Sequence, residues 1–198
     1  PTGGGKTHTA VIWGLRNFIT KHKKIIWLAH RHELIDQALF SFKQNAYKDY
    51  LVPRKESIKF KQVSSVHSKV RDIVGDEDIL IISTTTFGNS IKEIIAKYKM
   101  HDTKEMLLVI DEAHHAPART YRKGIDGCYN NFTTTIVGLT ATPYRTLESE
   151  SGAMHRMFHD DIIYNIGLND LIAKGILSQP DIMDVETNVD LRDAAQEY

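Results

Sequence analysis

The stretch MLLVIDEAHH, residues 106–115, joins an apolar run directly to a group of polar residues. Its first half is apolar enough for a strand that is buried on both faces of a sheet. The next five residues contain four polar ones: Asp111, Glu112, His114 and His115. Charge at the tip of a core strand is costly unless a ligand or an ion meets it there. The stretch therefore predicts a core strand whose carboxyl end carries a binding site.

Apolar runs on either side of this stretch predict further strands and helices. Strands are expected at residues 24–29, 58–63, 78–83, 133–140 and 162–166. Helices are expected at residues 6–20, 34–42 and 87–98, with a short one ending at Gly175 and a loop at 48–57. The alternating pattern of 58–63 is typical of an exposed or edge strand. Strands that alternate with helices favour a parallel α/β sheet with helices on both faces.

The composition sets few limits on function. The chain has 198 residues, with 25 Lys and Arg balancing 25 Asp and Glu, so a nucleic-acid contact has to come from a local patch. A single cysteine, Cys128, excludes an internal disulfide framework and favours a cytoplasmic location. No apolar run approaches the roughly 18 residues of a membrane span, so we expect no membrane partner.

The chain opens with PTGGGKT, residues 1–7, which matches the phosphate-loop pattern G-x-x-x-x-G-K-[ST] from its second position on. Glycines let backbone N–H groups approach phosphate oxygens, and the N-terminus of the following helix favours an anion. Lys6 would reach the β- and γ-phosphates, and the Thr7 hydroxyl would ligate Mg²⁺. The alternative is a glycine-rich turn before a helix. The predicted nucleotide-binding residues are Thr2, Gly3, Gly4, Gly5, Lys6, Thr7 and Asp111.

The two polar stretches have linked chemistry. Asp111 would hold the Mg²⁺ of Mg-ATP, usually through water, and Glu112 would orient or deprotonate the attacking water. We expect the strand that ends at Asp111 to run beside the strand leading into the phosphate loop. The alternative is an acidic surface turn, but two motifs with connected roles favour an ATP site.

Four blocks of the sequence resemble the first motor domain of superfamily 2 helicases and translocases. They are PTGGGKT, WLAHRHELIDQ (27–37), DEAHH (111–115) and GLTATPYR (138–145), in the family's order. Within that superfamily, the sequence is most similar to the DEAH-containing branch found in type III restriction subunits. Residues 164–180 are also similar to the stretch that follows these blocks in that branch. The resemblance covers nearly the whole chain and implies a RecA-like fold and ATP-driven movement on nucleic acid.

The resemblance also implies roles for individual residues. His114, Thr140 and Thr142 would couple the nucleotide state to the grip on nucleic acid, unless the two threonines only form a polar turn. Arg31 would hold a phosphate of the bound strand, or it belongs to a solvated turn. Thr84 and Thr85 would offer hydroxyls and amides to phosphate; as helix-capping residues they would need no ligand.

Family members carry parts that this sequence lacks. The strand before the phosphate loop would lie upstream of Pro1, and no second motor domain follows Pro180. We therefore expect residues 1–180 to form a first motor domain lacking its first strand, and residues 181–198 to begin the connection to the second domain. The chain would be weak or inactive alone. The expected partners are that second domain, nucleic acid with DNA favoured, and restriction-type subunits.

The same residues allow other interpretations. A nucleotide-gated binding switch would use the same fold without translocation. A nuclease is disfavoured because no paired-carboxylate-and-lysine pattern is evident. His155 and His159 have helical spacing for a metal site, but no Cys lies near them, so we expect structural or solvated side chains. Cys128 has no evident base nearby, so we expect an inert thiol.

Overall fold

The computed structural model describes residues 3–46, 57–115, 119–142, 157–158 and 162–181. The strands are β1 Lys24–Ala29, β2 Phe60–Val63, β3 Ile79–Ser83, β4 Glu105–Asp111 and β5 Thr133–Leu139. The α-helices are α1 Lys6–Asn17, α2 His32–Ala46, α3 Thr84–Met100, α4 Arg119–Tyr129 and α6 Leu168–Ala173. Short 3₁₀ helices are η1 Ile19–Lys21, η2 Val70–Asp72 and η3 Ala113–His115. None of the described helices is long and apolar enough to cross a membrane.

The strands form one parallel sheet in the order β2-β3-β1-β4-β5. This confirms the predicted parallel α/β fold. Among the described strands β3 is the only neighbour of β2, as expected of an edge strand; Val63 forms one further isolated bridge with Ser68. Because all the strands run the same way, their carboxyl ends meet at one edge of the sheet.

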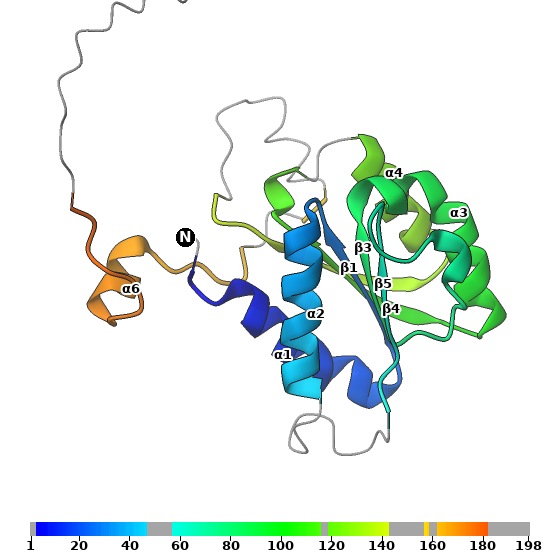
Figure 1. Ribbon diagram of the computed structural model, residues 1–198, viewed down its shortest axis with the longest axis horizontal. Helices are drawn as coiled ribbons and strands as arrows, with labels where there is room; N and C mark the ends of the chain where they lie inside the picture. Colours follow the sequence, from blue (N-terminus) through cyan, green and yellow to red (C-terminus); the bar gives the residue numbers. More distant parts are fainter. Residues whose placement is uncertain (1–2, 47–56, 116–118, 143–156, 159–161, 182–198) are drawn as a thin grey trace, which may run out of the picture.

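Helices cover both faces of the sheet (Figure 1). Side chains of α1 and α2 pack with Trp27 on one face, whereas side chains of α3 and α4 pack with Leu28 on the other. Successive side chains of a strand point to opposite faces, so a strand covered on both sides reads as a continuous apolar run. This explains why β1 and the middle of β4 contain almost no polar residue.

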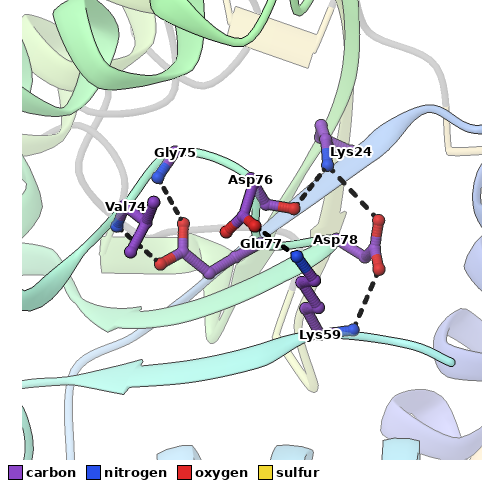
Figure 2. Close-up of polar contacts among 7 residues, drawn as sticks. All are labelled: Lys24, Lys59, Val74, Gly75, Asp76, Glu77 and Asp78. Atoms are coloured by element: carbon purple, nitrogen blue, oxygen red, sulfur yellow. Dashed lines mark hydrogen bonds and ion pairs between the residues drawn. The ribbon is translucent and has the colours of Figure 1, made fainter.

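A group of charged residues fastens the amino ends of the strands (Figure 2). The Lys24 ammonium donates to the Asp76 carbonyl at 2.8 Å and to Asp78 Oδ1 at 3.3 Å. Asp78 Oδ2 accepts the backbone N–H of Lys59 at 2.9 Å, and the Lys59 ammonium pairs with the Asp76 carboxylate. Buried Asp78 therefore joins the segments that lead into β1 and β2.

Glu77 closes the turn that precedes β3. Its carboxylate accepts the backbone N–H groups of Val74 and Gly75, both at 2.8 Å (Figure 2). Gly75 has a φ of +103°, and a Cβ there would lie 2.3 Å from the Lys97 carbonyl oxygen, so only glycine fits. These contacts set the amino edge of the sheet and leave the carboxyl edge for a ligand.

Two expectations about the strands are wrong. Strand β4 pairs with β1 on one side and β5 on the other, so no strand leading into the phosphate loop lies beside it. Residues 162–166 form no strand, although they are apolar. Ile163 is 83% exposed, and an apolar run becomes a strand only where a neighbouring strand can pair with its backbone.

Candidate functional site

The phosphate loop enters α1 through two glycines with left-handed backbone. Gly3 has a φ of +81° and Gly5 a φ of +78°. Residues other than glycine rarely adopt these backbone angles. Gly5 is the N-cap of α1, and the helix begins at Lys6 with no acidic residue in its first turn. The first N–H groups of the helix therefore meet no acidic side chain from that turn, as an anion site requires. Thr2 lies outside the described residues.

The segment after α6 touches the phosphate loop. A Cβ built on Gly3 would lie 3.1 Å from Leu177 Cδ2, so the leucine side chain packs close to the loop backbone. Gly175, with a φ of +68°, follows α6, and the N–H groups of Ile176 and Leu177 donate to the Leu171 carbonyl. This turn brings Leu177 back beside α6, which Figure 1 shows near the N-terminal end of α1.

Asp111 lies at the end of β4, where only 5% of its surface is exposed. Burial raises the pKa of the Asp111 carboxyl above its ordinary value; the Glu112 N–H and the charge of Lys6 lower it in part. That N–H donates to Asp111 Oδ1 at 3.0 Å. A buried carboxylate whose charge is destabilised by burial gains from a bound cation, and carboxylate oxygens are ligands that Mg²⁺ prefers, so Asp111 fits Mg²⁺.

Glu112 turns the chain sharply after β4. Its φ is +49°, an uncommon value for a residue other than glycine. Its carbonyl accepts the His115 N–H at 3.0 Å, which starts the short helix η3. The Glu112 carboxylate lies 3.3 Å from His114 Nδ1. Strained backbone is often found at functional sites, and here it sets the position of the predicted general base.

His114 joins the ends of β4 and β5. Its Nδ1 lies 3.0 Å from Thr140 Oγ1, and that hydroxyl oxygen accepts the backbone N–H of Thr142, also at 3.0 Å. The structure thus brings together the three residues that the resemblance linked. Their role in coupling stays a prediction. Thr142 takes part through its backbone, and its side chain is exposed.

The candidate nucleic-acid residues lie at the same edge of the sheet. Arg31 is exposed in the turn between β1 and α2, and Thr85 is exposed in the first turn of α3. Thr84 is only 5% exposed, which leaves little of it for a nucleic acid to touch. The cap of α3 is Ser83, whose hydroxyl accepts the Thr86 N–H, so the threonines are not needed for that purpose. Contacts of Arg31, Thr84 and Thr85 with nucleic acid remain predictions.

Comparison with known proteins now bears on this site. The family of the type III restriction enzyme res subunit matches residues 1–145. The chain belongs to this family. The matched region includes the phosphate loop, the end of β4 and the Thr140–Thr142 turn. This confirms the resemblance to the type III restriction branch of the superfamily 2 helicases.

The chain is similar to two named proteins along almost its whole length. The chain is 28% identical to the "Putative ATP-dependent helicase IRC3" of Saccharomyces cerevisiae, over 97% of this chain and 26% of the relative. It is 30% identical to the "Type I restriction enzyme EcoAI endonuclease subunit" of Escherichia coli, over 96% of this chain and 21% of the relative. The chain therefore spans about a quarter or less of these two proteins.

A solved structure supports the fold. The helicase domain of Hef from Pyrococcus furiosus superposes with a TM-score of 0.56 at 20% identity, covering 79% of this chain and 31% of that one. Together with the parallel sheet, this agrees with a first RecA-like domain.

One contact at this site was not predicted from the sequence. The ring of His30, just beyond β1, packs edge-on against the ring of His115, with centroids 4.9 Å apart. His115 in turn lies 4.2 Å from His114, centroid to centroid. The only signal in the sequence was that each histidine follows an apolar run closely; the pairing of β1 with β4 that brings them together was not predicted.

Two other predictions concern thiol and imidazole chemistry. Cys128 is buried, and burial raises the pKa of its thiol to about 12. Burial of Cys128 is as expected, and the raised pKa agrees with an inert thiol, because the thiolate is the reactive form. His155 and His159 lie outside the described residues.

Proposed function

We propose that the chain is a motor domain that hydrolyses Mg-ATP to move on, or remodel, nucleic acid. Residues 1–180 form the first RecA-like domain, and residues 181–198 begin the connection to a second motor domain in a longer protein. DNA is the substrate to test first. Subunits of the restriction type are the expected partners beyond the second domain.

One observation carries this proposal: left-handed glycines lead into α1 at Lys6, and buried Asp111 ends a central strand of the same parallel sheet domain. A glycine loop before a helix, or an acidic turn after a strand, is common when it occurs alone. Here the two occur in one domain, with the chemistry that a nucleoside triphosphate and its metal require, which supports a shared ATP site. The family match to residues 1–145 supports the same reading.

Different residues of the chain bind the phosphates, activate the attacking water and hold the metal. The loop N–H groups and the Lys6 ammonium bind the phosphates and compensate their charge as it shifts toward the leaving oxygen. Glu112 orients the attacking water and accepts its proton. Thr7 and Asp111 would hold Mg²⁺, which when bound neutralises charge on the phosphate oxygens.

Coupling to nucleic acid uses the same edge of the sheet. His114 contacts both the Glu112 carboxylate and the Thr140 hydroxyl, so a change at the γ-phosphate alters the hydrogen bonds at the end of β5. Arg31 and Thr85 are exposed at the ends of neighbouring strands, where they reach the phosphates of a bound strand.

The test is ATP hydrolysis by the full-length protein that contains this domain, with and without DNA. Lys6→Ala is expected to lower the rate by about a hundredfold or more while the thermal unfolding curve stays unchanged. Lys21→Ala, an exposed lysine at the end of η1, is the matched control. Near wild-type turnover in Lys6→Ala overturns the phosphate-loop assignment. Hydrolysis that DNA does not stimulate favours a nucleotide-gated binding switch instead.

A further inference from the structure

Three imidazole rings form a continuous row at the carboxyl edge of the sheet. His114 contacts Thr140 and lies 4.2 Å from His115 between ring centroids. His115 packs against His30 with centroids 4.9 Å apart and the rings at 60°. His30 directly precedes Arg31, which is exposed. The row therefore runs from the ATP-site turn to a candidate nucleic-acid residue.

The surroundings of His30 suit ring packing. Burial lowers the pKa of His30, and the neighbouring His115 lowers it further, so the neutral ring prevails at neutral pH. Its Nδ1 is shielded from solvent and has no hydrogen-bond partner within the described part of the chain. The ring is thus held by its contact with His115 and by burial.

The backbone makes this contact mechanically direct. Strands β1 and β4 are neighbours, with Leu28 paired to Ile110. Both strands are buried up to that point, whereas His30 lies in the turn after β1 and His115 ends η3. The contact between His30 and His115 therefore joins the turn after β1 to the short helix η3 that follows Glu112.

We propose that His30 is a positioning residue: through its contact with His115 it transmits the nucleotide state of the site to the Arg31 turn and hence to the bound strand. The inference rests on the proposed function and extends it, because it adds a second route beside the His114–Thr140 pair. Packed side chains that move between two arrangements can carry such coupling.

A double-mutant cycle on the full-length protein tests the route. The measured quantity is the factor by which DNA stimulates ATP hydrolysis, taken for the wild type, His30→Ala, His115→Ala and the double variant. Each single variant is expected to lower this factor about fivefold or more, and the double variant to lower it no further. His30→Phe, which keeps a packing ring, is expected to restore most of the loss. His101→Ala, at the opposite edge of the sheet, serves as the control.

The possible results distinguish a failure of the His30 proposal from a failure of the proposed motor function. Losses that multiply in the double variant mean that the histidines act independently, and unchanged stimulation means that they do not act at all; both overturn the inference. A wild-type protein that hydrolyses ATP but ignores DNA overturns it together with the motor function. Thermal unfolding curves identify any variant whose loss comes from misfolding.

A second measurement does not depend on turnover. The ring-proton resonances of His30 are expected to shift when Mg-ADP is added to the wild-type protein. The shift is expected to vanish in His115→Ala while Mg-ADP still binds. A shift that persists in His115→Ala means that the nucleotide reaches His30 by another route, which overturns the inference.

Discussion

His114 Nδ1 lies 3.0 Å from Thr140 Oγ1 and 3.3 Å from Glu112 Oε2. One imidazole nitrogen thus lies within reach of the predicted general base and of the hydroxyl that ends β5. If Glu112 engages water and phosphate as proposed, the hydrogen bonds of that nitrogen are expected to differ between the two nucleotide states. This arrangement supports separate roles: Glu112 would act in ATP hydrolysis, whereas His114 and Thr140 would couple hydrolysis to nucleic acid.

Thr140→Val removes the hydroxyl and keeps the branched shape. We expect ATP binding to persist while translocation or strand displacement per ATP falls about fivefold or more, because we assign the hydroxyl to the proposed coupling element. Side-by-side assays of ATPase rate and translocation measure this. Thr135→Val, on an exposed position of the same strand, is the control. Thr142→Ala should have little effect because it keeps the backbone N–H that contacts Thr140. A proportional loss of both rates would assign Thr140 to the chemical step.

Glu112→Gln keeps the shape of the side chain and loses its basicity. Hydrolysis should fall about a hundredfold or more, whereas the affinity for Mg-ATP should stay close to that of the wild type. Single-turnover hydrolysis and equilibrium binding of a fluorescent ATP analogue report the two quantities. Asp111→Ala provides the contrast, since it should lose affinity through the metal. Equal losses of affinity in both variants would show that Glu112 also acts through the metal.

Asp111→Asn should stabilise the nucleotide-free domain. The pKa of Asp111 is raised by burial in the folded state, so this carboxyl contributes stability below its unfolded pKa and loses it as pH rises through the folded pKa. At neutral pH the ionised carboxylate therefore opposes folding, and the amide does not. Thermal melts from pH 8 downward should show the advantage of Asp111→Asn shrinking as pH falls. An advantage independent of pH would mean that packing, not charge, is responsible.

Gly3→Ala and Gly5→Ala form a matched pair in the phosphate loop. Both have positive φ, so each should cost about 1 kcal/mol or more of folding stability. A Cβ on Gly3 also meets Leu177 at 3.1 Å, whereas a Cβ on Gly5 has nothing within 4 Å. Chemical denaturation should therefore show a larger loss for Gly3→Ala, and Leu177→Ala should remove the excess. Equal losses in the two glycine variants would contradict this contact.

The sequence by itself determined the parts of the site that contiguous residues specify. The glycines before Lys6 need no partner elsewhere to predict a phosphate loop, because their backbone freedom is a local property. The apolar run before Asp111 likewise predicts a buried strand that ends in a carboxylate. The four motifs together were enough to indicate the family.

Only the tertiary structure decided which strands are neighbours and which side chains meet. Pairing of β4 with both β1 and β5 depends on backbone contacts between distant segments, and no local pattern encodes it. That pairing places His30 against His115 and His114 against Thr140. The burial of Thr84 and the exposure of the apolar residues 162–164 follow from the same long-range packing, which decides what a given side chain finally faces.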